Sequence, residues 1–181
     1  MTFTDMTRFA VVLVAAAVLM AASPYAGLEK RSIKALSPER IAALEAGAGA
    51  GYALAAELNG YPGPRHVLDL ADALKLTPGQ RAKTEALFSE MRRGAVALGR
   101  ELIRQEAALE ALFRDGGINE TALSVQTAAI GATEARLRTT HLKYHIQMAG
   151  VLSAAQRMAY NDLRGYKSDK RGHSGHSGHG R

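Results

Sequence analysis

Two long stretches of the chain repeat apolar residues at alternating steps of three and four, and this pattern restricts the possible folds more than any other feature. Such spacing places side chains on one face of an α-helix. Between the stretches lies Asp115-Gly116-Gly117, a sequence that ends helices. The pattern therefore predicts two long antiparallel helices, about residues 78–114 and 119–148, joined by a short turn. The predicted faces comprise Phe88, Met91, Ala95, Leu98, Leu102, Leu109 and Leu112, and Leu123, Thr127, Ile130, Glu134, Leu137, His141, Tyr144 and Met148.

A short phrase written twice marks the starts of two helices. Leu76-Thr77-Pro78-Gly79-Gln80 recurs as Leu152-Ser153-Ala154-Ala155-Gln156. In each copy the Ser or Thr hydroxyl can accept from the backbone three residues on, while the Gln reaches back to the first residue's N–H. The first copy opens the long helix at residue 78, and the second predicts a last helix that ends near residue 164.

The remaining helix signals lie before the first long stretch. Ser37-Pro38-Glu39 opens a helix that is expected to run through Leu54 and Leu58, although three glycines interrupt it. A turn cluster at residues 59–64 precedes a short helix over about 65–74. With abundant Ala, Leu, Glu, Arg and Gln, the chain is predicted to be all-α. A hairpin alone cannot bury both faces, so the flanking helices or a second subunit must cover it, and we expect a dimer.

The N-terminus predicts export. Phe9 to Ala22 is an uninterrupted apolar run after Arg8, a length typical of a secretory signal. The uncharged stretch continues to Leu28, so residues 1–26 form either a cleaved signal peptide or a signal anchor retained through residues 9–28. Both readings place the rest of the chain in the periplasm.

The C-terminal residues 165–181 differ in composition from the rest. They repeat His every third residue among Gly and Ser, which is typical of a flexible tail. Neutral imidazoles bind Zn²⁺, Cu²⁺ and Ni²⁺, so this tail is the first metal candidate. Much of the net charge of +6 lies here, and the folded part shows no basic stripe for nucleic acid. The tail imidazoles belong to His173, His176 and His179.

A second metal candidate lies in the second long stretch. His141 and His145 are four residues apart and share a helix face, and Met148 could add a thioether suited to copper. Packing in the core is the alternative explanation for His141 and Met148. The chain lacks Cys, a phosphate-binding Gly loop and a nucleophile elbow, and we expect no enzymatic activity.

Both capping phrases, the export segment, the hairpin and the His tail together resemble the Spy/CpxP superfamily of periplasmic stress proteins. Leu76–Gln80 fully matches its paired Leu-Thr-x-x-Gln motif, and Leu152–Gln156 resembles it with Ser in place of Thr. Residues 59–68 are similar to a branch described as heavy-metal resistance or sensor proteins. The resemblance covers residues 36–164. It implies a helical-hairpin dimer that holds unfolded clients without ATP or binds metal.

The resemblance also implies an alternative role. Relatives of the CnrX type are membrane-anchored sensors that pass metal occupancy to a regulatory partner. Their His-x-x-x-His pair lies in the first helix, whereas this chain has no His before His66. The closest match to their later His/Met pair is His145 with Met148.

Overall fold

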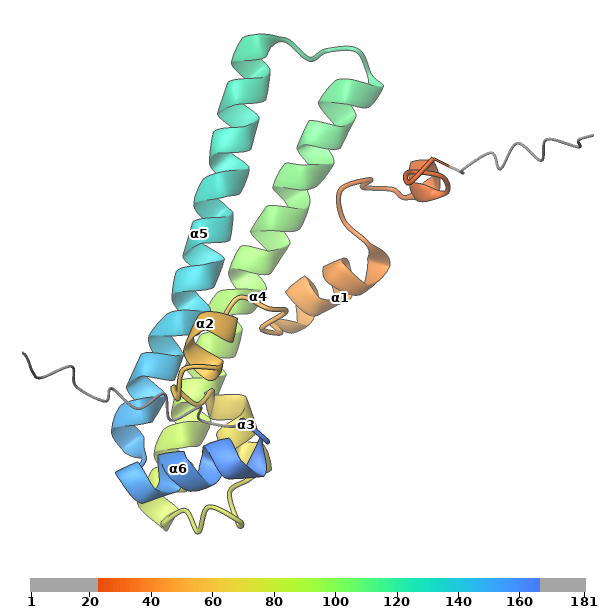
Figure 1. Ribbon diagram of the computed structural model, residues 1–181. Helices are drawn as coiled ribbons and strands as arrows, with labels where there is room; N and C mark the ends of the chain where they lie inside the picture. The colour runs from red at the N-terminus through yellow and green to blue at the C-terminus, as the bar shows by residue number, and fades with distance from the viewer. Residues whose placement is uncertain (1–22, 167–181) are drawn as a thin grey trace, which may run out of the picture.

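The computed structural model describes residues 23–166, and all regular structure within this range is helical (Figure 1). The predicted all-α class is confirmed. The expected signal segment (residues 1–26) and tail (residues 165–181) lie mostly outside the described range. The helices are η1 (Leu28–Lys30), α1 (Pro38–Ala46), α2 (Leu54–Glu57), α3 (Pro64–Asp69), α4 (Pro78–Arg114), α5 (Glu120–Val151) and α6 (Ala154–Leu163).

The two long helices α4 and α5 run side by side, and α2, α3 and α6 lie toward the end away from their connecting turn, whereas α1 lies beside the middle of the pair (Figure 1). Thr77 caps α4, and the helix ends at Asp115. Asn119 accepts from the backbone N–H of Ala122 and starts α5. Local capping chemistry therefore sets where both helices begin. No helix among residues 23–166 has both the length and the apolar character needed to cross a membrane.

The two capping phrases meet in space. Both form complete capping boxes, and the side-chain amides of Gln80 and Gln156 also hydrogen-bond to each other at 2.8 and 3.0 Å. The amide of Gln80 also donates to the Val151 carbonyl and that of Gln156 to the Leu74 carbonyl. Each Gln thus caps its own helix and joins it to the neighbouring chain segment.

The helix expected to run from residue 37 to residue 58 is in fact two helices separated by a loop. Helix α1 ends at Gly47, whose φ of 66° is the left-handed conformation common after a helix end. Helix α1 packs closely on α4. A Cβ on Gly99 of α4 would collide with the backbone of Leu44 in α1, which shows how close the two helices are. Leu54 and Leu58, which were expected to continue the apolar face, are exposed.

The buried stripe of α5 also differs from the expected one. Leu123 and Thr127 are exposed, because no other described element covers this end of the hairpin. Further along, His145 is buried and Tyr144 only partly so. The stripe turns toward His145 because α2 and α3 pack on that side of α5. The buried residues of α5 are Thr133, Leu137, His141, His145 and Met148.

Two other boundaries differ from the sequence expectation. Helix α3 is shorter than expected, since it ends at Asp69 and turns follow it to residue 75. Helix α5 passes through Gly150, which was expected to stop it, and ends at Val151. The core divides into two clusters, one around Leu44, Leu102 and Leu137, and one around Met148 and Tyr160.

Candidate metal site

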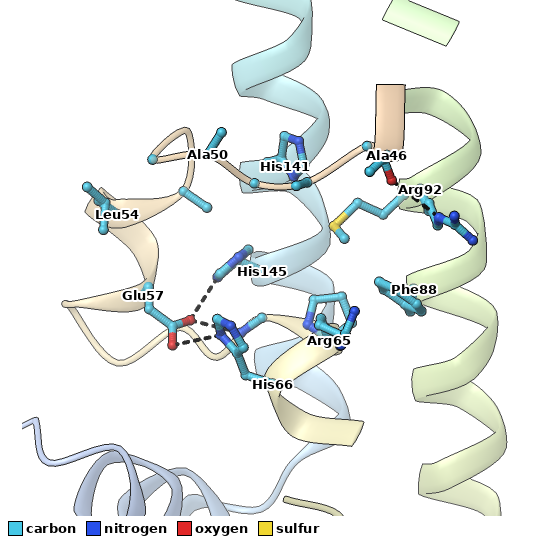
Figure 2. Close-up of a pocket in the computed structure, with 18 of the residues that line it drawn as sticks. Ala46, Ala50, Leu54, Glu57, Arg65, His66, Phe88, Arg92, His141 and His145 are labelled. Carbon is cyan, nitrogen blue, oxygen red and sulfur yellow. Dashed lines mark hydrogen bonds and ion pairs between the residues drawn. The ribbon is translucent and has the colours of Figure 1, made fainter. Parts of the chain in front are cut away.

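A cavity of about 650 Å³ lies between the loop after α1, helix α3 and the long helices (Figure 2). One wall is the loop of residues 46–53, which is made almost entirely of Gly and Ala and has few side-chain atoms to fill the space. The opposite walls carry Phe88 and Arg92 of α4 and His141 and His145 of α5. Glu57 of α2 and His66 of α3 close the lower end as drawn in Figure 2. Three imidazoles and the carboxylates of Glu57 and Asp69 therefore line one cavity.

Glu57 is the most highly connected polar residue of this region, although only 6 % of it is exposed. Its Oε1 accepts hydrogen bonds from the hydroxyls of Tyr160 and of Tyr166 (3.1 Å), and its Oε2 accepts from the Gly63 N–H at 3.1 Å. Burial by itself would raise the pKa of this carboxyl. The two tyrosine hydroxyls and the charges of the nearby histidines outweigh burial and hold the pKa below its usual value.

His66 and His145 both turn their Nδ1 atoms toward acceptors. His66 Nδ1 lies 3.3 Å from Glu57 Oε1, and His145 Nδ1 lies 2.7 Å from the Tyr61 carbonyl oxygen and 3.7 Å from Glu57 Oε2 (Figure 2). A carbonyl or an ionised carboxylate only accepts, so the proton of each neutral ring belongs on Nδ1. Nε2 then carries the free lone pair. Metal-binding histidines are commonly oriented in this way by an outer carboxylate or carbonyl.

The absence of a side chain on Gly63 allows the His145 ring to pack directly against the backbone at this position. A Cβ at this position would lie 2.8 Å from Cε1 and 2.9 Å from Nε2 of His145. The backbone of Gly63 is extended, with φ −83°, a conformation open to any residue. The glycine is therefore needed for the close approach of the ring and not for its own backbone conformation.

His141 is the most deeply buried of the three imidazoles, with 2 % of the residue exposed. Its ring stacks on Tyr52 at 5.7 Å between centroids, and its Nε2 is buried without a hydrogen-bond partner. Burial, helped by the charge of His145, lowers the pKa of His141 to about 4. The ring therefore stays neutral at ordinary pH. A buried ring nitrogen without a partner is uncommon, and an ordered water, a bound ion or strain can account for one.

The sequence-predicted ligands separate into three groups. His141 and His145 line the cavity together, whereas Met148 lies in the second core cluster with Val67 and Tyr160. The tail histidines His173, His176 and His179 lie outside the described residues and stay predictions. Within residues 23–166, no three carboxylate or imidazole side chains are already placed to hold one metal ion together.

Sequence reasoning missed Glu57 and His66 as members of this site. The two tyrosine partners of Glu57 are remote in sequence, since Tyr160 lies 103 residues away and Tyr166 109 residues away. No local spacing can indicate such a contact. The one available signal was the turn cluster of residues 59–64, which brings the chain back so that α2 and α3 present Glu57 and His66 to each other.

Comparison with known proteins gives one match. A family model described as heavy-metal resistance matches residues 41–159. No curated protein and no solved structure matches the chain. The matched range contains the three histidines of the cavity and Glu57, and it ends before the tail.

Proposed function

The chain belongs to the heavy-metal resistance family, and from this premise we propose that it binds a heavy-metal ion in the cavity through His66, His145 and His141. Imidazole nitrogen suits Zn²⁺, Cu²⁺ and Ni²⁺, and these are the ions proposed. Glu57 acts from outside the coordination shell, because its oxygens already accept from Tyr160, Tyr166 and Gly63.

The observation that carries this proposal is the buried, unpartnered Nε2 of His141, a residue that lines a cavity together with two more imidazoles. A metal ion would supply the missing partner. The orientation of His66 and His145 supports the same role, because Nδ1 is engaged in each ring and Nε2 is left for a ligand. The lowered pKa of His141 helps as well, since a metal need not displace a proton from this ring.

Calorimetric titration of the full chain with Zn²⁺, Cu²⁺ and Ni²⁺ tests the proposal. His66→Gln and His145→Gln should each weaken the tightest site about tenfold or more. Gln147→Ala is the matched control, because this residue is exposed on α5 next to the site. Unchanged affinity in both His variants would rule out the cavity as the metal site.

Holding of unfolded clients is a second proposed function, and exposed apolar side chains near the hairpin turn support it. Phe113, Leu123 and Val125 are all exposed there. Such side chains could contact an unfolded chain or the same face of a second copy, as in the expected dimer. The client-holding role is tested by whether the protein, at stoichiometric ratio, suppresses the aggregation of a denatured client. Sedimentation equilibrium tests whether the protein binds a second copy of itself.

Export to the periplasm is also a proposal, and it depends on residues 9–28. N-terminal sequencing of the native protein distinguishes a cleaved signal peptide from a retained membrane anchor. A chain that begins after residue 26 supports a soluble periplasmic protein. A chain that retains residue 1 and fractionates with the inner membrane supports the alternative, an anchored sensor with a membrane-bound regulatory partner.

A further inference from the structure

We propose that Tyr52 is a positioning residue of the cavity. Its ring orients His141, and its hydroxyl fastens the loop of residues 46–53 that separates His141 from solvent. Access to His141 is then controlled by release of this hydroxyl. The inference rests on the proposed function where it concerns metal, whereas access of other small solutes to His141 can be measured without a metal ion.

His141 has almost no surface through which a solute could reach it. The residue is 2 % exposed, and its Nε2 is buried without a hydrogen-bond partner among the described residues. An ion that enters the cavity therefore meets this nitrogen only after a covering segment has moved. The segment that covers the ring is for this reason part of the site.

The loop of residues 46–53 covers the ring of His141. In Figure 2 the loop crosses in front of His141 between Ala46 and Ala50, and a Cβ built on Gly49 would lie 4.0 Å from His141 Nδ1. Tyr52, near the end of the loop, stacks on the ring with 5.7 Å between centroids and 8° between planes. It is also the one side chain of the loop larger than a methyl group. Movement of this loop would expose His141.

The hydroxyl of Tyr52 fastens the loop to both α1 and α5. It accepts a hydrogen bond from Arg40 Nη2 at 2.6 Å and donates one to Glu134 Oε2 at 2.6 Å. Hydrogen bonds to charged groups are stronger than those between neutral groups. Arg40 Nη1 also donates to the Ala50 carbonyl at 3.3 Å, which holds the loop at a residue whose φ of 38° is uncommon outside glycine. We call the side chains of Arg40, Tyr52 and Glu134 the latch.

The latch can open while the helices stay packed. Glu134 precedes His141 by seven residues, which is two turns of α5, so Tyr52 bonds to one and stacks on the other along a single helix face. The side chains of Arg40 and Glu134 are 28 % and 40 % exposed. Water can therefore replace both bonds of the Tyr52 hydroxyl when the loop moves. Opening exposes His141 without unfolding α1 or α5.

The first test measures how fast diethyl pyrocarbonate modifies each cavity histidine in the metal-free full chain. This reagent reacts with imidazole nitrogens that it can reach. Trypsin cuts after Lys143, between His141 and His145, so mass spectrometry quantifies the two in separate peptides. In the native protein His66, whose side chain is 41 % exposed, should react fastest and His141 slowest.

Two variants open the latch from different sides. Tyr52→Phe keeps the stacked ring and removes the hydroxyl, whereas Glu134→Ala removes a partly exposed acceptor on α5. Each should raise the modification rate of His141 about tenfold, the factor that corresponds to loss of one hydrogen bond to a charged group. The rate at His145 should stay native, because the other bonds of the cavity are intact.

Tyr61→Phe is the matched control, because Tyr61 is 45 % exposed and lies in the turn between α2 and α3. It should leave the rate at His141 native. An unchanged rate in both latch variants would overturn the role of Tyr52. Equal increases at His141 and His145 would overturn it as well, since they would show a general loss of packing. Neither result would bear on whether the cavity binds metal.

The second test follows uptake and release of Zn²⁺ by stopped flow with a chromophoric chelator. If His141 is a ligand, Tyr52→Phe should speed both steps about tenfold, and the affinity, which is their ratio, should change less than either rate. Weaker affinity with a native rate of uptake would overturn control of access. Faster modification of His141 with native Zn²⁺ rates would uphold control of access by Tyr52 and would exclude His141 as a ligand in the proposed function.

Discussion

The two ends of the long hairpin carry similar apolar spacing but have different surroundings (Figure 1). At the base, which we define as residues 78–102 of α4 and 133–151 of α5, the short helices cover the stripe, and Leu87, Met91, Leu137 and Met148 are buried. At the tip, residues 111–127, comparable apolar side chains such as Phe113 and Leu123 are exposed. Spacing of apolar residues thus predicts a helix face, and only the packed neighbours decide whether that face is buried.

The base also holds the polar groups that the tip lacks. His141 and His145 are buried there, and Glu57 of α2 is buried beside His145. Burying such groups costs free energy unless hydrogen bonds compensate, and Glu57 is compensated while the Nε2 of His141 is not. The base therefore combines a packed apolar core with buried polar groups.

The largest difference between base and tip should appear when a methyl group is added to a helix glycine. Gly99→Ala places a Cβ against the backbone of Leu44, which has no room to move without shifting α1. We expect the free energy of unfolding to fall by about 3 kcal/mol. Urea denaturation measures it.

Gly131→Ala is the matched control for Gly99→Ala. Gly131 lies in α5 just beyond the tip, and a Cβ there meets no atom within 4 Å. The substitution should stabilise the protein by roughly 0.5–1 kcal/mol, because Ala favours helix over Gly. Equal effects of the two substitutions would contradict the close packing of α1 on α4.

Acid should weaken the base through His141. The pKa of this imidazole is about 4 in the folded protein, below its ordinary 6.5, so between these values the unfolded chain binds a proton that the folded protein does not. Stability is therefore fully present above pH 6.5 and falls as pH drops toward 4. The loss should reach about 2 kcal/mol by pH 5. Urea denaturation at pH 7 and pH 5 measures it.

His141→Leu tests the origin of this pH dependence. The variant removes the titrating ring, so the difference in unfolding free energy between pH 7 and pH 5 should shrink by most of that amount. The pKa of Glu57 is lowered, so its contribution is present above pH 4.5 and lost only below it. An unchanged pH dependence in His141→Leu would show that other groups cause the acid sensitivity.

A smaller effect on stability is expected from Gly63→Ala. The new Cβ would press on the His145 ring, which must shift by a few tenths of an ångström or more. Unfolding free energy should fall by about 1 kcal/mol. Zn²⁺ affinity should fall by about tenfold, because the ring of His145, a proposed ligand, would be displaced. Gly79→Ala, where a Cβ meets nothing, is the control. A Gly63→Ala protein with native Zn²⁺ affinity would contradict the ligand role of His145.

The smallest effect on stability should come from the tip. Phe113 is 58 % exposed, so Phe113→Ser should change the unfolding free energy by less than about 0.5 kcal/mol. If the tip holds clients, the same variant should lose suppression of aggregation. Native suppression in Phe113→Ser together with Val125→Ser would place client contacts elsewhere.

Sequence reasoning succeeded where the information is local. The starts of α1, α4, α5 and α6 follow from the capping residues Ser37, Thr77, Asn119 and Ser153, since each side chain bonds to a backbone N–H three residues away. It was less accurate at the loop after Gly47 and at the buried stripe of α5. Both depend on where α1, α2 and α3 pack, which no short window of sequence contains.

The candidate site was half predictable. His141 and His145 could be paired because a helix brings residues four apart to one face. Their separate environments could not be predicted, with one ring on Tyr52 and the other on the Tyr61 carbonyl. Glu57 and His66 became members of the site only through contacts across the turn of residues 59–64 and with α6.

The repeated capping phrase shows most clearly which contacts the sequence determines and which only the tertiary structure decides. By itself the sequence determined that Gln80 and Gln156 close capping boxes, because these bonds join residues three apart. Only the tertiary structure decided that the two amides bond to each other across 76 residues. The same is true of the cavity, since three imidazoles and a carboxylate from three helices meet only after those helices have packed.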